Sequence, residues 1–199
     1  MARTQAADYE QRREAIVDNA AILFARQGFH GASMADLAKA CGMSKSLLYH
    51  YYAAKEDLLY AVMLSHVDQL VGEVDHVMEM DQEPTAKLST LIHAFMTHYI
   101  GATDRQKVLL NELENLPPAQ RTLIVSKQRM IIDSLQRLLV DIFGKKETDA
   151  EARVRTMLVF GMINWTHTWF DPSGPVSADK LANMVVDFTI GAARRDSPA

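Results

Sequence analysis

The sequence predicts an all-α protein, because helical periodicity runs through nearly the whole chain and strand alternation of useful length is missing. Glycine and proline gather at a few positions, and the segments between them carry apolar residues at helical spacing. The net charge differs between the two parts of the chain. Residues 1–52 hold six Lys or Arg against five acids, whereas residues 53–199 hold 15 against 20. We expect about nine helices in two domains, residues 1–53 and residues 54–199.

The amino-terminal part is expected to contain three helices. An apolar stripe predicts the first over residues 9–27, and Gly28 stands where a left-handed carboxy-terminal cap belongs. Ser33 can cap a short helix over residues 34–40, with a carboxylate in its first turn. Gly42 interrupts the chain, and Ser44 can cap a third helix that ends near residue 50.

The rest of the chain is expected to form a helical bundle. Proline and glycine mark its boundaries, with Pro84 at a first-turn position and a Pro-Pro pair at residues 117–118. The loop DPSGPVS separates the last two helices. The six helices of this bundle are predicted at residues 55–80, 83–100, 104–116, 117–143, 150–170 and 177–193.

Two short helices joined by a glycine-containing turn form the motif that places a second helix in the DNA major groove. Leu37, Ala38, Met43 and Leu47 are expected to pack these helices together. Small hydroxyls then allow close approach to base edges, tyrosines donate to phosphates, and a helix amino terminus attracts phosphate. The DNA-binding candidates are Ser33, Ser44, Lys45, Ser46, Tyr49, His50, Tyr51 and Lys55. On turn chemistry alone, an ordinary helical hairpin with an aromatic core fits equally well.

From Arg13 to Leu59 the sequence resembles the tetracycline-repressor (TetR) family of bacterial transcription regulators. The matching string is REAIVDNAAILFARQGFHGASMADLAKACGMSKSLLYHYYAAKEDLL. The resemblance implies a homodimer on a palindromic double-stranded operator, with a helical domain that binds an effector and dimerises. It also implies phosphate contacts from Tyr49, Tyr51 and Lys55, and places Lys45 and Ser46 at or near bases. His50 stands at a variable position, so its role is inferred from chemistry alone.

The segment GMINWTHTWFDPSGPVSADKLA is similar to the eighth helix and following loop of TetR-type regulators that respond to acyl-CoA thioesters. This resemblance implies a repressor that an acyl-CoA releases from DNA, in fatty-acid, sterol-ring or phenylacetate breakdown. Three alternatives remain open: the segment is a structural helix ending, the effector is a drug-like or other hydrophobic molecule, or the protein binds DNA without an effector.

Two further sets of residues are expected in the carboxy-terminal region. Apolar stripes on the last two helices fit a four-helix dimer interface, although each stripe also fits the subunit's own core. The predicted interface residues are Leu158, Gly161, Met162, Leu181, Met184, Val185 and Phe188. An effector cavity needs adaptable apolar walls and a few polar anchors. Its candidates are Phe95, Met96, Tyr99, Asn111, Asn115, Arg129, Met130, Trp165 and Trp169, and cations for CoA phosphates are Arg105, Lys107, Arg121, Lys127 and Arg129.

Several classes of protein are not expected. The chain has no Gly-rich phosphate loop, no H-E-x-x-H, no G-x-S-x-G and no C-x-x-C, so an enzyme or a metal site is not predicted. No cofactor is expected besides the small-molecule effector. The single cysteine, Cys41, excludes an intrachain disulfide. Neither a membrane span nor a signal peptide is visible, so a cytoplasmic location without a membrane partner is expected.

Overall fold

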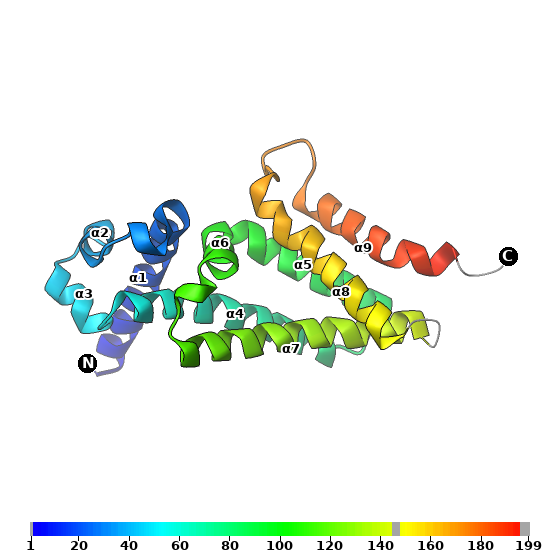
Figure 1. The fold of residues 1–199 in the computed structure, drawn as a ribbon, viewed down its shortest axis with the longest axis horizontal. Coiled ribbons are helices and arrows are strands. Elements are labelled where there is room, and N and C mark those ends of the chain that lie inside the picture. The colour runs from blue at the N-terminus through cyan, green and yellow to red at the C-terminus, as the bar shows by residue number, and fades with distance from the viewer. Residues whose placement is uncertain (1, 145–147, 196–199) are drawn as a thin grey trace. The chain divides into compact units, whose positions relative to one another are not determined.

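The computed structural model describes residues 2–144 and 148–195 (Figure 1). Within these residues the regular elements are all helical, which confirms the predicted fold class. The α-helices are α1 (Ala2–Gly31), α2 (Met34–Ala40), α3 (Lys45–Tyr51), α4 (Lys55–Glu79), α5 (Pro84–Gly101), α6 (Thr103–Asn111), α7 (Pro118–Phe143), α8 (Asp149–Asn164) and α9 (Ala178–Arg195). Short 3-10 turns η1 (Leu113–Asn115) and η3 (Trp165–Thr168) follow α6 and α8.

The chain forms two compact units. Unit 1 comprises Met1–Val67 and Asp104–Val125, and unit 2 comprises Asp68–Thr103 and Ser126–Ala199. Helices α4 and α7 each contribute residues to both units. Unit 1 therefore contains α6 as well as the three amino-terminal helices. The division by function at residues 53 and 54 stays a prediction.

Local chemistry fixes the ends of the first three helices. Gly28 has φ 72° and ψ 164°, so α1 is interrupted there and resumes for a final turn. Ser33 accepts a hydrogen bond from the Asp36 amide while the Asp36 carboxylate binds the Ser33 amide, a complete capping box. Gly42 takes φ 64° in the turn, and Ser44 caps α3. These signals were readable in the sequence, and the structure confirms them.

The core of unit 1 contains Ile16 and Phe24 of α1, Leu37 of α2 and Leu48 of α3, each at most 1% exposed. Leu47 was expected in this core, and the structure corrects that expectation, because its side chain is 38% exposed. With Ser44 as the cap, α3 begins at Lys45 and turns Leu48 inward. Consecutive helical residues differ by about 100° around the axis, so Leu47 faces another direction.

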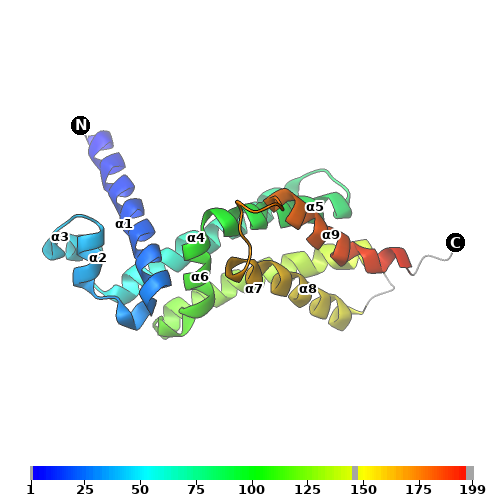
Figure 2. The ribbon, with the colours of Figure 1, turned by 90° about the horizontal axis from the view of Figure 1, so that it is seen from above.

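Unit 2 contains the packed helices of the carboxy-terminal region. Helix α9 packs on α5 and α8. Figure 2 shows α9 running beside α5. The Phe95 ring of α5 contacts the rings of Tyr99 and Phe160, with centroid separations of 6.0 and 6.2 Å. The helix predicted over residues 150–170 ends earlier, at Asn164, and continues as η3. In the part of the chain that the structure describes, no helix is long and apolar enough to cross a membrane.

Candidate DNA-binding surface and effector region

Helix α3 exposes most of the side chains expected to meet DNA. Ser44, Lys45, Ser46, Tyr49 and His50 are all exposed. The Ser44 hydroxyl accepts a hydrogen bond from the Leu47 amide at 3.2 Å and lies 3.1 Å from the Ser46 hydroxyl. The ammonium of Lys45 lies 5.8 Å from the centre of the Tyr49 ring. The first turn of α3 therefore presents hydroxyls and one cation at a helix amino terminus, a surface suited to phosphates and base edges.

Ser33 is exposed, but its polar groups are already engaged. Its hydroxyl donates to the Asp36 carboxylate at 2.5 Å, and its amide donates to the same carboxylate at 3.1 Å. Hydrogen bonds from Ser33 hold the pKa of Asp36 below its ordinary value. An ionised carboxylate thus occupies the amino terminus of α2. Contact between Ser33 and DNA stays a prediction.

Lys55 begins α4 and is partly buried. Its ammonium donates to the carbonyl oxygens of Phe29 at 2.7 Å and Ala32 at 2.9 Å, and it lies 4.2 Å from the centre of the Phe29 ring. Lys55 thus satisfies carbonyls at the end of α1. The phosphate contact expected of Lys55 stays untested, and two of its three donors already have protein partners.

Side chains beside α3 extend this surface beyond the residues chosen from the sequence. The Tyr9 ring stacks on the Tyr51 ring, with centroids 4.9 Å apart and planes at 23°. The Arg13 guanidinium lies 5.6 Å from the centre of the Tyr52 ring. Leu47 is exposed, as described above. Leu47 was missed because its apolar character suggested the core, whereas the contact of Tyr9 with a residue 42 positions later left no pattern in the sequence.

The effector candidates fall into separate groups. Phe95, Met96 and Tyr99 are buried in unit 2, whereas Arg129 and Met130 are exposed on α7. Asn111 and Asn115 belong to unit 1. There, Asn111 donates to the Lys107 carbonyl at 2.9 Å and Asn115 to the Glu112 carboxylate at 2.7 Å. Of these candidates, the structure brings together only Phe95, Met96 and Tyr99 as an apolar group.

Trp165 and Trp169 were expected in the wall of an effector cavity, and that role stays a prediction. Because α8 gives way to a 3-10 turn at Trp165, the two indoles are 65% and 58% exposed. They line an open groove of about 540 Å³ on the outer face of α8 and α9. The same groove is lined by all the predicted dimer residues, namely Leu158, Gly161, Met162, Leu181, Met184, Val185 and Phe188.

The exposure of these groove residues distinguishes two roles. Leu181 and Val185 are at most 8% exposed and pack within the subunit, whereas Leu158 and Phe188 are 63% and 71% exposed. A Cβ added at Gly161 would meet nothing within 4 Å, so this glycine leaves the face open. A contiguous apolar face of this kind is typical of a protein interface.

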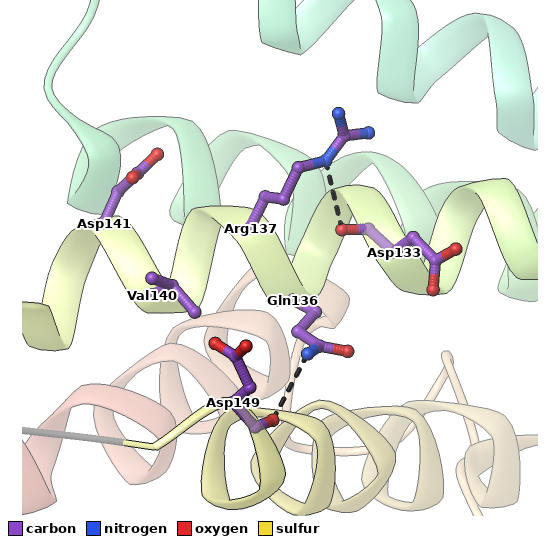
Figure 3. A pocket seen from close by; sticks show the side chains of 6 residues that line it. All are labelled: Asp133, Gln136, Arg137, Val140, Asp141 and Asp149. Carbon is purple, nitrogen blue, oxygen red and sulfur yellow. Dashed lines mark hydrogen bonds between the residues drawn. The ribbon is translucent and has the colours of Figure 1, made fainter.

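A second cleft, of about 440 Å³, lies between α7 and the start of α8 in unit 2. Figure 3 shows the carboxylates of Asp133, Asp141 and Asp149 around it, with Arg137 as the one cation among its lining residues. Arg137 donates to the Asp133 carbonyl at 3.3 Å and to the Ser134 hydroxyl at 3.1 Å. This cleft therefore carries net negative charge. Over residues 2–144 and 148–195, no group of three acids, histidines or cysteines is placed to hold a metal ion.

A helix-turn-helix whose second helix exposes hydroxyls and a cation is typical of a DNA-binding transcription regulator. Residues 16–62 match the family model for bacterial regulatory proteins of the tetR family, and residues 81–192 match that for the tetracyclin repressor-like, C-terminal domain. The chain therefore belongs to the TetR family and is a transcription regulator rather than an enzyme. Regulators of this family bind operator DNA and dimerise.

Solved structures agree with this assignment. A TetR-family regulator from Bordetella parapertussis 12822 is 36% identical, with 94% of this chain and 98% of that chain covered and a TM-score of 0.85. AibR, solved in complex with isovaleryl coenzyme A and operator DNA, is 25% identical, with 89% and 97% covered and a TM-score of 0.79.

Two curated relatives from Mycolicibacterium smegmatis are similar over most of their length. The transcriptional activator FasR is 23% identical, with 92% of this chain and 83% of the relative covered. The transcriptional repressor KstR2 is 25% identical, with 90% and 89% covered. Their names differ in the sign of regulation.

Proposed function

We propose that this regulator is a repressor that leaves its operator when it binds an acyl-CoA thioester. The observation that carries the proposal is the similarity to AibR along nearly the whole of both chains, because the AibR structure holds an acyl-CoA together with operator DNA. The match of residues 81–192 to the carboxy-terminal family domain supports effector binding in that region.

Unit 2 supplies apolar surface for the acyl group. The rings of Phe95 and Tyr99 are stacked with planes at 8°. Met96, which follows Phe95 in the sequence, is also buried. Methionine has three rotatable bonds and adapts to irregular shapes, so such a core can open around a short chain. Each methylene buried there stabilises the complex by about 0.8 kcal/mol.

The phosphates of CoA need cations, and most of the expected ones are already engaged. Arg121 pairs with Glu114, and Lys127 lies 2.7 Å from Asp68. Arg105 is buried against two carboxylates of α1. Arg129 is exposed and has no ion pair among the described residues, so it is the strongest candidate for a phosphate contact from unit 2.

Release from DNA requires that the thioester favour a second arrangement of the chain. Three residues separate helix α4 from the end of α3, and α4 contributes residues to both units, so it offers a continuous path for coupling. A preference of a few kcal/mol for the released arrangement empties most operators. The AibR complex contains both ligands at once, so release, rather than joint binding, is the part of the proposal that most needs a test.

The acidic cleft between α7 and α8 favours a second candidate, a regulator that responds to an organic cation. Asp141 and Asp149 line this cleft with Asp133 (Figure 3). Arg153 pairs with the Asp133 carboxylate at 2.9 Å, and Arg137 adds a second cation, so the cleft keeps a net charge of about −1. Such a site repels the phosphates of CoA and attracts an amine or a quaternary ammonium group. The two candidates therefore predict effectors of opposite charge.

The test begins with an operator selected in vitro from random duplexes by the full chain. Anisotropy of the labelled operator is then followed during titration with acyl-CoAs of graded length, phenylacetyl-CoA, the matching free acids, free CoA and a hydrophobic ammonium compound. We expect release by thioesters alone, and weaker thioester sensitivity in Arg129→Gln than in the control Lys180→Gln, an exposed lysine of α9. Release by the ammonium compound alone, with lost sensitivity in Asp141→Asn, supports the second candidate and refutes the first.

A further inference from the structure

We propose that the amino-terminal half of α1 is part of the DNA-binding surface, where Arg12 and Arg13 bind backbone phosphates beside the end of α3. The proposal rests on the DNA-binding function of the family and is independent of the effector. These residues precede the family match, which begins at residue 16.

The first step of the argument is the stack of Tyr9 on Tyr51. The ring centroids lie 4.9 Å apart and the planes meet at 23°. Tyr51 is the last residue of α3, and its ring centroid lies 5.8 Å from that of His50, with the planes at 81°. The stack therefore fixes one face of α1 against the end of the helix that presents the base-reading side chains.

The second step is the position of two arginines on that face. Residues three and four apart are neighbours on a helix surface, so Arg12 and Arg13 flank Tyr9. Arg13 lies 5.6 Å from the Tyr52 ring centre, and its side chain is 41% exposed. Arg12 is exposed and has no ion pair among the described residues. The Arg13 guanidinium thus lies beside the end of α3, and Arg12 is exposed on the neighbouring position of α1.

The third step concerns the acids of α1, which offset this charge. Glu14 and Asp18 both bind the buried guanidinium of Arg105, so one of their two negative charges is compensated from α6. Glu10 lies 3.6 Å from Arg13, and Asp8 stands one helical turn before Arg12, so two further acids lie on this stretch. Counted from Asp8, residues 8–13 therefore hold two arginines against two acids, so the stretch offers DNA two exposed guanidinium groups and no net positive charge.

The fourth step is the need of the DNA-binding surface for cations. Sequence-independent affinity for DNA comes from lysines and arginines that neutralise phosphates. Among the candidates chosen from the sequence, the ammonium of Lys55 is directed at the carbonyls of Phe29 and Ala32, which leaves Lys45 as the accessible lysine. Arg12 and Arg13 supply the additional charge, and a guanidinium binds phosphate with two parallel hydrogen bonds.

The experiment measures the affinity of the full chain for its selected operator and for an unrelated duplex over a range of salt concentrations. Arg12→Gln is expected to reduce the slope of log affinity against log salt by about 0.9 per lost contact, or about 1.8 for a symmetric dimer. Both duplexes should lose affinity by the same factor, because a phosphate contact does not read sequence. Arg13→Gln should act in the same direction.

Arg26→Gln is the matched control, since Arg26 is an exposed arginine of the same helix without an ion pair among the described residues, and 14 residues or roughly 21 Å from Arg12. The slope of log affinity against log salt for Arg26→Gln should equal that of the wild type. Folded Arg12→Gln and Arg13→Gln proteins with an unchanged slope, or an equal loss in Arg26→Gln, would overturn the proposal. A wild-type chain that binds neither duplex would instead refute DNA binding itself, so the two failures are distinguishable.

Discussion

The guanidinium of Arg105 lies 2.7 Å from the carboxylate of Asp18, although 87 residues separate the two in sequence. The same side chain binds Glu14 and donates to the Ser65 hydroxyl at 2.6 Å. Arg105 is 7% exposed, whereas both carboxylate side chains are more than half exposed. Burial lowers the pKa of Arg105, but its hydrogen bonds with Asp18 and Glu14 outweigh burial and raise it overall. One buried cation thus joins α6 to α1 and α4.

This network predicts an asymmetric response to mutation. Arg105→Met leaves two carboxylates that water can solvate, and we expect a loss of about 1–3 kcal/mol in the free energy of unfolding. The double change of Glu14→Gln and Asp18→Asn leaves a buried guanidinium without a counter-charge. We expect this variant to lose about 3–5 kcal/mol in the free energy of unfolding. Urea unfolding measures both. Equal losses, or a larger loss for Arg105→Met, would contradict this description of the network.

We expect Lys55→Met to affect mainly the stability of the protein and Lys45→Met to affect mainly its DNA binding. Lys55→Met removes two hydrogen bonds from an ammonium to carbonyl oxygens, so the free energy of unfolding should fall by roughly 2–4 kcal/mol with the salt slope unchanged. Lys45→Met should change stability by less than about 0.5 kcal/mol. Its salt slope should fall by about 0.9 per lost contact. A stable Lys55→Met protein with a reduced slope would restore the phosphate contact expected from the sequence.

Leu47 is an exposed apolar side chain in the first turn of the helix expected to enter the major groove. Thymine is the base that offers a methyl group there, so we expect Leu47 to contact thymine methyls in the operator. Replacement of thymine by uracil in the selected operator should weaken binding of the wild type several-fold. Leu47→Ala should bind the thymine duplex less tightly and should not distinguish the two duplexes. Equal discrimination by both proteins would exclude the contact.

The α8–α9 face is expected to form the dimer interface, and tryptophan fluorescence can measure its burial. The chain has two tryptophans, and both line this groove. Phe188→Glu places a charge on the most exposed apolar residue of the face, and we expect monomers in sedimentation and red-shifted tryptophan emission. Val154→Glu, on the same helix as Gly161 but not among the groove residues, is the control and should remain dimeric. If the Phe188→Glu protein remains dimeric, the dimer interface lies elsewhere on the molecule.

Much of the fold could be predicted from local chemistry. Ser33, Ser44 and Pro84 mark helix starts and Gly28 marks a helix interruption, because caps and left-handed turns depend on neighbouring residues alone. The end of α8 at Asn164 was missed. Thr166 and Thr168 there bind the carbonyls three residues before them, a competition with helix geometry that apolar periodicity does not reveal.

The candidate site was predictable only in part. Exposure of Lys45, Ser46 and Tyr49 follows from the cap at Ser44 and from one turn of helical geometry. The partners of Lys55 and Arg105 come from distant segments of the chain, so sequence spacing carries no signal for them. For the same reason the tryptophans could be recognised as a pattern but not placed, since a helix that is apolar around a wide arc fits a cavity wall and a dimer face equally well.

The central claim is that one dimer binds either operator DNA or an acyl-CoA thioester with strong mutual exclusion. Native mass spectrometry of the operator complex during titration with a short acyl-CoA measures every species at once. We predict that the species of two 22.3 kDa chains with one duplex disappears as dimers carrying the thioester and free duplex appear together. Complexes that retain the duplex while fully loaded with thioester, or that take up none at concentrations saturating for release by another compound, would contradict the account.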